Sequence, residues 1–80
     1  MRDKIYSTSD LGIASYILTK GETLLETKRE GGNSKRVSFL FSLSDTLEDR
    51  VNEFINDGEV KARQFLHTLK DLKAMTFKTE

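Results

Sequence analysis

The sequence contains no cysteine and a single histidine, and it lacks a long apolar run. Without cysteine, neither a disulfide framework nor a thiolate metal site can supplement a small core. No stretch approaches the roughly 18 apolar residues that span a bilayer, and the charged residues 1–6 lack the apolar run of a signal peptide. These absences predict a protein with no membrane segment, located in the cytoplasm of a bacterium or of a virus-infected host cell.

The sequence also lacks the residue patterns that enzymes commonly use for catalysis. The histidine, His67, stands between Leu66 and Thr68, and no H-x-x-x-H or H-x-x-E spacing surrounds it. Gly31 and Gly32 fit neither of the glycine patterns that bind phosphates next to a helix. We therefore predict no enzyme, no metal and no cofactor, and we interpret His67 as a structural residue.

Length and composition predict one globular domain. The chain has 80 residues, of which 36% are apolar and 32% are charged, which is enough for one core and too few for two. We expect a single domain over residues 1–80, with an ordered core of about 4–75. The thirteen basic and thirteen acidic residues cancel, so no net field draws in a polyanion.

The charges are unevenly distributed along the chain. Residues 20–36 hold five basic and three acidic residues, residues 45–59 hold one and six, and residues 61–78 hold five and one. Asp49 and Glu53 lie one helical turn apart, a spacing that fits either paired catalytic carboxylates or a solvated helix face. We favour the solvated face, because both residues lie opposite the apolar side of that segment. The molecule is expected to have one acidic and one basic face.

Alternating apolar and polar residues predict three strands. They are Lys4–Thr8, a second within Glu22–Glu30, and a third, the clearest, at Lys35–Ser42. One face of the third strand carries Val37, Phe39, Phe41 and Leu43. The residues Gly31–Ser34 tolerate positive φ, so the second and third strands are predicted to form a hairpin.

Apolar residues at i, i+3, i+4 and i+7 predict a first helix from about Asp10 to Lys20. The hydroxyls of residues 7–9 are the expected N-terminal caps, and Gly21 is expected in the left-handed conformation at the C-terminus. A second helix is predicted to begin at Ser44 or Asp45.

The second helix is predicted to end at Gly58, and a third helix to run from about Lys61 to Ala74, with residues 76–80 frayed. The apolar side of the third helix carries Ala62, Phe65, Leu66, Leu69 and Leu72, and its basic side carries Lys61, Arg63, Lys70 and Lys73. The order β-α-β-β-α-α predicts an α+β fold, a two-layer sandwich in which helices cover one face of a three-stranded, mainly antiparallel sheet.

Basic residues are concentrated around the predicted hairpin and on the third helix. The candidate nucleic-acid-binding residues are Lys28, Arg29, Lys35 and Arg36, with support from Arg63 and Lys70. Cations beside the alternating aromatics of a strand can hold phosphates and stack bases. We therefore hypothesise a small nucleic-acid-binding protein, with single strands among its candidate ligands. For the aromatics themselves we favour a place in the core under the helices. The alternative for the cations is that they are solvated or paired with the acidic helix.

A second hypothesis is a protein-interaction module, either a homodimer or a modulator of a host or viral protein. A sheet covered on one side leaves a face or an edge open, and such edges invite pairing. An acidic and a basic helix can also recognise each other across a dimer. Charge segregation alone therefore does not separate the two hypotheses.

The opening of the chain resembles a family of short uncharacterised proteins of bacteria and their phages. The residues that carry the resemblance are Tyr6-Ser7-Thr8-Ser9-Asp10-Leu11, Ala14, Tyr16-Ile17-Leu18 and Lys20-Gly21, with Leu69-Lys70-Asp71-Leu72 near the end. In that family a Y-x-T-S-D-L-x-x-A-x-Y-L opening precedes a hairpin and two helices. The resemblance implies a stand-alone phage or prophage protein, and it brings no catalytic residues.

Overall fold

The computed structural model describes residues 4–29 and 36–78. The elements are β1 (Ile5–Thr8), α1 (Leu11–Thr19), β2 (Leu24–Arg29), β3 (Val37–Ser42), α2 (Leu47–Ile55) and α3 (Ala62–Lys78). Their order and the α+β fold confirm the prediction. The predicted turn at Gly31–Ser34 lies outside the described residues.

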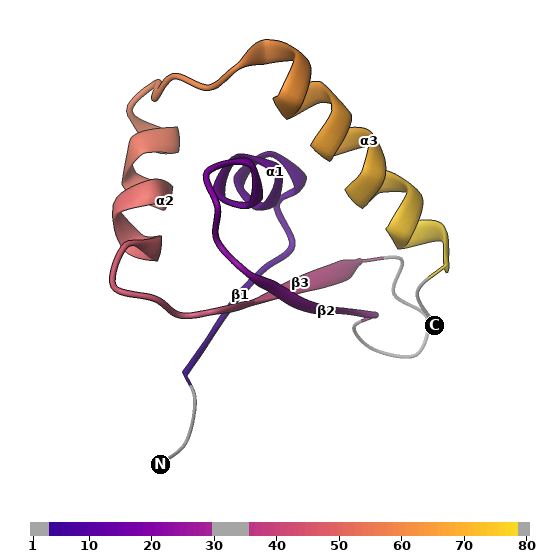
Figure 1. The fold of residues 1–80 in the computed structure, drawn as a ribbon. Helices are drawn as coiled ribbons and strands as arrows, with labels where there is room; N and C mark the ends of the chain where they lie inside the picture. Colours follow the sequence, from indigo (N-terminus) through magenta and orange to yellow (C-terminus); the bar gives the residue numbers. More distant parts are fainter. Residues whose placement is uncertain (1–3, 30–35, 79–80) are drawn as a thin grey trace.

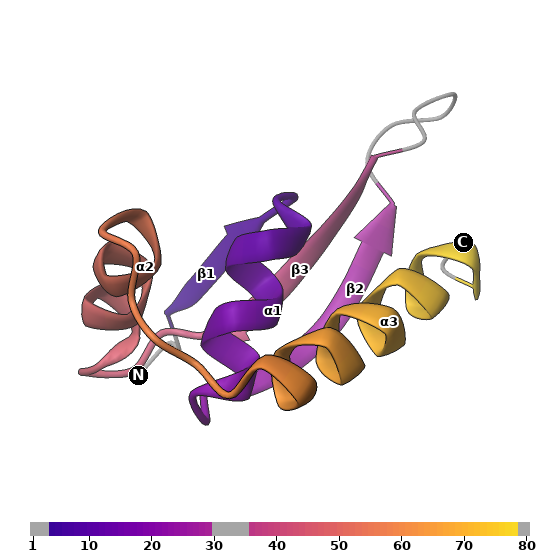
Figure 2. The same ribbon diagram turned by 90° about the horizontal axis from the view of Figure 1, so that it is seen from above.

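The three strands form an antiparallel sheet in the order β1-β3-β2, with β3 in the centre. Figure 1 shows the three helices on the same side of this sheet, with α1 between α2 and α3. Seen from above in Figure 2, α2 lies on the β1 side of the sheet and α3 on the β2 side. The helices therefore cover one face, as predicted, and leave the other open.

An irregularity in β2 decides which of its side chains face the helices. Leu24 pairs with Phe41 and Glu26 with Leu40, so Leu25 is an additional residue in the pairing. One extra residue in a strand turns every later side chain to the opposite face. From Glu26 onward, the side chains that a strict alternation from Leu24 would direct toward the helices lie on the open face, and the others lie on the helix side.

The core is built around α1. Four consecutive residues of this helix, Ala14–Ile17, are buried, and four consecutive residues point to all sides of a helix. The buried apolar residues that form the core with it are Phe39, Phe41, Leu47 and Leu72. Val37, Phe39 and Phe41 are all at most 6% exposed, which confirms that the aromatics of the third strand belong to the core.

The two ends of α1 are held by local hydrogen bonds. The carboxylate of Asp10 accepts from the amide of Ile13 at 2.9 Å, so Asp10, rather than a preceding hydroxyl, is the N-cap. The hydroxyl of Thr8 instead accepts from the amide of Asp10. At the C-terminus, Gly21 has φ of 105° and donates to the carbonyl of Leu18, which confirms its predicted left-handed conformation.

The start of α2 differs from the prediction. The N-cap is Thr46, and its side chain makes no capping hydrogen bond. The hydroxyls of Ser44 and Thr46 instead donate to the carboxylate of Glu22, at 2.6 and 2.7 Å. Because Glu22 is only 8% exposed, its carboxylate needs these donors more than the exposed helix terminus does.

The end of α3 also differs from the prediction. The helix continues to Lys78, so the expected end near Ala74 and the fraying of Thr76–Lys78 are wrong. Thr76 is half-buried, and the guanidinium of Arg29 donates to its carbonyl oxygen at 3.4 Å. This contact from β2 satisfies a carbonyl that a helix C-terminus leaves without an intrahelical partner.

A hydrogen-bonded tyrosine joins α1 to α2. Tyr16 is 2% exposed, and its hydroxyl donates to Glu53 Oε1 at 3.0 Å, while Glu53 Oε2 lies 2.7 Å from Arg50 Nη1. Burial and the hydrogen bond to Glu53 raise the pKa of Tyr16 above its ordinary value of 10. Glu53 is therefore more than the solvated charge that the sequence suggested.

We predict that Tyr16→Phe lowers the free energy of unfolding by about 0.5–1.5 kcal/mol at pH 7, because one hydrogen bond is lost. The pKa of Tyr16 is raised in the folded state, so above pH 10 the unfolded chain loses this proton first and stability falls. The stability difference between the parent and Tyr16→Phe should therefore shrink from pH 9 to pH 11 in urea denaturation.

The matched control is Tyr6→Phe, which removes the other phenol of the chain. It removes a phenol from β1 and leaves the hydrogen bond between Tyr16 and Glu53 intact. A difference between the parent and Tyr16→Phe that stays constant across this pH range contradicts the role assigned to the buried hydroxyl.

Candidate nucleic-acid interface

Cationic side chains gather along the side of the molecule formed by α3. We call Arg36, Lys61, Arg63, Lys70 and Lys73 the basic flank; all five residues are exposed. The 17 residues of α3 contain no glycine or proline, so one uninterrupted helix carries three of these cations. They line three hollows in the surface.

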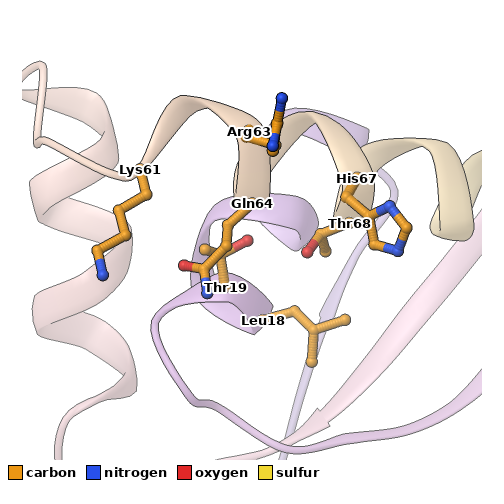
Figure 3. Close-up of a pocket in the computed structure, with 7 residues that line it drawn as sticks. All are labelled: Leu18, Thr19, Lys61, Arg63, Gln64, His67 and Thr68. Atoms are coloured by element: carbon orange, nitrogen blue, oxygen red, sulfur yellow. The ribbon is translucent and has the colours of Figure 1, made fainter.

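The first hollow lies between the end of α1 and the start of α3 and has a volume of about 650 Å³. Figure 3 shows Gln64 extending from α3 toward Thr19 of α1, while Arg63 points away from α1. Lys61 and His67 line the same hollow. Cations, an amide and hydroxyls around a small apolar floor suit an anionic ligand.

A second hollow lies on α3 itself, and a third at the other end of the junction between α1 and α3. Arg63, Leu66, His67 and Lys70 line the second. Arg36 and Lys73 meet in the third, together with Ser9 and Thr76. Because Arg63 and His67 line both the first and the second hollow, these two hollows adjoin along α3, while Arg36 and Lys73 line a separate hollow toward the end of the same helix.

The cations of the predicted hairpin are divided between different environments. Lys28 pairs with Ser38 and Arg29 with Val37, and paired residues share a face of the sheet. Lys28 therefore lies on the open face, whereas Arg29 lies on the helix side and bonds to α3. Lys35 falls outside the described residues.

The structure thus brings Arg36, Arg63 and Lys70 to one flank and separates Lys28 from them. Lys73, which the basic pattern of the third helix had already included, completes the hollow beside Arg36. The basic side of the third helix, read from the sequence, was sufficient to predict Lys73 as a member of this surface. No local signal distinguishes Lys28 from Arg29, because their directions depend on the irregularity at Leu25.

An acidic flank lies on the other side of α1. It consists of the exposed residues Asp45, Glu48, Asp49, Asp57 and Glu59, and Figure 1 shows α2 and α3 separated by α1. Ile55 of α2 is 66% exposed and Leu66 of α3 is 55% exposed, so the prediction that Leu66 belongs to the apolar side of the third helix that packs on the core is wrong. Each flank therefore combines charges of one sign with an exposed apolar side chain.

The open face of the sheet is mixed in character. Ile5 and Leu25 are 54% and 51% exposed, and Leu40 is half-buried. Ser7, which pairs with Leu40, and Lys28 add polar groups to the same face. Glu26, which also pairs with Leu40, adds an acidic group, so this face combines apolar contacts with hydroxyls and charges of both signs.

Two kinds of feature do not occur in the part of the chain that the structure describes. Within residues 4–29 and 36–78, no group of three or more histidine or acidic side chains is arranged to hold a metal ion. None of the helices over these residues has the length and apolar character needed to cross a membrane.

Sequence comparison identifies the family. The family model of the domain of unknown function DUF5659 matches residues 3–78, nearly the whole chain, and the chain belongs to this family. No match is found among curated proteins or among solved structures. The assignment agrees with the resemblance to uncharacterised proteins and names no activity.

We predict that Arg29→Gln lowers the free energy of unfolding by about 0.5–1.5 kcal/mol and speeds amide hydrogen exchange in the last turn of α3. The reason is the loss of the hydrogen bond to the Thr76 carbonyl and of a positive charge at a helix C-terminus. Lys28→Gln, which removes the neighbouring charge from the open face, should change stability by less than about 0.5 kcal/mol. Equal effects of the two substitutions contradict the different orientations.

Proposed function

We propose that this member of the DUF5659 family is a small, non-enzymatic protein that binds nucleic acid through the basic flank. The observation that supports this most directly is the row of exposed cations on and beside α3. Residues 61–78 carry five basic residues and one acidic residue. Lysine and arginine in such a row bind phosphates favourably, because the nucleic acid releases condensed counterions.

The length and exposure of α3 support the proposal. Seventeen residues at about 1.5 Å each give a helix of roughly 25 Å, which corresponds to about seven phosphates of one duplex strand spaced about 3.4 Å apart. The acidic flank lies across α1 and repels phosphates. A nucleic acid therefore approaches the α3 side, and its binding should depend strongly on salt.

A cytoplasmic location and a phage or mobile-element origin belong to the same proposal. The cytoplasm supplies nucleic acid, and the absence of cysteine is compatible with a reducing compartment. The likeness of the opening residues to phage proteins supports the origin.

We predict that Arg63→Gln with Lys70→Gln weakens oligonucleotide binding about tenfold or more at low salt. Each lost phosphate contact should also lower the slope of log K against log salt by about 0.7 to 0.9. Fluorescence anisotropy with labelled single- and double-stranded oligonucleotides at several salt concentrations measures both quantities.

The matched control is the double variant Lys4→Gln with Lys28→Gln. It removes the same charge from two exposed residues that lie outside the basic flank. We expect the control to lose no more than about threefold in affinity, with an unchanged salt slope. Equal losses in the two double variants place the interface elsewhere, and no binding by the parent at tens of micromolar contradicts the proposal.

Contact between copies of the chain is a second candidate function. The acidic flank with Ile55 and the basic flank with Leu66 are complementary in charge and both offer an exposed apolar side chain. The open sheet face is a weaker candidate, since three strands of at most six residues give roughly 300 Å², against about 800 Å² per partner in a standard interface. Contact between unlike flanks is heterologous and yields rings or open chains.

A charge exchange tests this second candidate. The variant Asp45→Lys/Asp49→Lys changes the net charge of the acidic flank from −5 to −1, and the variant Arg63→Glu/Lys70→Glu changes that of the basic flank from +5 to +1. We predict that the parent associates at low salt and dissociates at about 0.5 M salt, where charges are screened within a few ångströms. Each variant alone should be monomeric in analytical ultracentrifugation, and an equimolar mixture of the two should associate.

If the mixture sediments as the two monomers do, the flanks do not recognise each other. Association that persists at high salt also contradicts the proposal, because it requires an interface without charge complementarity. Circular dichroism of each variant serves to confirm that the charge reversals leave the helices intact.

A further inference from the structure

One large aromatic side chain lies almost completely in solvent. Phe77, in the last turn of α3, is 81% exposed, more than any other large apolar residue of the described chain. Burial of an aromatic ring is among the strongest contributions to folding. The isolated fold gains almost none of that contribution from Phe77, so the ring is available to a ligand.

Phe77 lies among cations of the basic flank. Lys73 and Lys70 are four and seven residues before it on the same helix, spacings that place side chains on one face, and both are exposed. Arg36 meets Lys73 in the hollow that Thr76 also lines. The guanidinium of Arg29 donates to the carbonyl of Thr76, the residue immediately before Phe77.

The other exposed apolar residues of α3 do not form a patch with Phe77. Leu66 is eleven residues away, roughly 16 Å along the helix axis, and Met75 points to another side because two residues turn a helix by about 200°. A partner surface that docks by apolar contact needs a larger continuous patch. An isolated ring between phosphate-binding side chains instead fits a planar aromatic group that carries a phosphate.

Nucleobases are such groups, but a duplex stacks them inside and leaves only their edges accessible. In a single strand each base has a free face, and stacking on an aromatic side chain tolerates any sequence. We propose that Phe77 stacks on an unpaired base and makes the basic flank selective for single-stranded nucleic acid. This inference rests on the proposed function and adds the class of nucleic acid.

The test uses Phe77→Trp, because the chain contains no tryptophan and the substitution introduces a single fluorescent indole. Excitation at about 295 nm then reports on this position alone. We expect a labelled thymidine oligonucleotide to quench the indole over the concentration range in which anisotropy shows binding. A duplex of equal length should bind with much less quenching.

Affinity measurements complete the test. Phe77→Ala should weaken single-strand binding about tenfold or more and change duplex binding by less than twofold. Met75→Ala is the matched control, since it removes another exposed apolar side chain of α3, on a side of the helix that lines none of the three hollows described above. It should leave both affinities unchanged.

The outcomes separate this inference from the proposed function. If Arg63→Gln/Lys70→Gln weakens binding while Phe77→Ala does not, or weakens single-strand and duplex binding equally, the stacking role is overturned and the interface stands. If the parent binds no oligonucleotide, both are overturned. Quenching of the indole by single strands together with a selective loss in Phe77→Ala supports the inference.

Discussion

The burial of α1 against β3 determines where the rest of the molecule lies. Ala14 and Ile17 of α1 are completely buried, as is Phe41 of β3. Because α1 occupies the middle of the covered sheet face, α2 and α3 pack on its two sides and contact it more than each other. One central apolar helix therefore fixes the positions of two amphipathic ones.

The separation of α2 from α3 converts a neutral chain into a molecule with two charged flanks. The acidic and basic segments follow each other directly in the sequence, with Glu59 and Lys61 two residues apart. If α2 packed against α3, their charges would face each other and partly cancel. The apolar helix between them keeps each set of charges exposed to solvent, where it is available to a partner of opposite charge.

Local patterns predicted the six elements, the buried face of β3 and the glycine at the end of α1, because each depends on residues close in sequence. The predictions that failed depend on contacts between distant residues. Ser44 does not cap α2, since a carboxylate 22 residues away takes its hydroxyl. The last turn of α3 is held from β2 across 47 residues. Leu66 and Ile55 match the helical period but lie at the margin of the core.

The residues of the candidate site also divide into those that local sequence patterns predict and those whose positions depend on distant contacts. The cations of α3 could be predicted, since a helix displays one face at a fixed period, and this face remained exposed. The hairpin cations could not be assigned, because the extra residue at Leu25 exchanges the directions of Lys28 and Arg29. A strict alternation from the core-facing Leu24 would place Arg29 in solvent and Lys28 under the helices. In the observed register Lys28 lies on the open face and Arg29 lies on the helix side, where its guanidinium bonds to the last turn of α3.

The direction of Arg29 affects the end of α3 that carries Phe77. A charge at the Thr76 carbonyl secures the last turn of α3, and that turn carries Phe77. Without the contact, the end of the helix would leave its carbonyls to water and fray more readily. An exposed ring contributes more to binding when it is already held in position, because ordering it on binding costs conformational entropy. The cation lost from the hairpin surface thus helps to order the aromatic end of the basic flank.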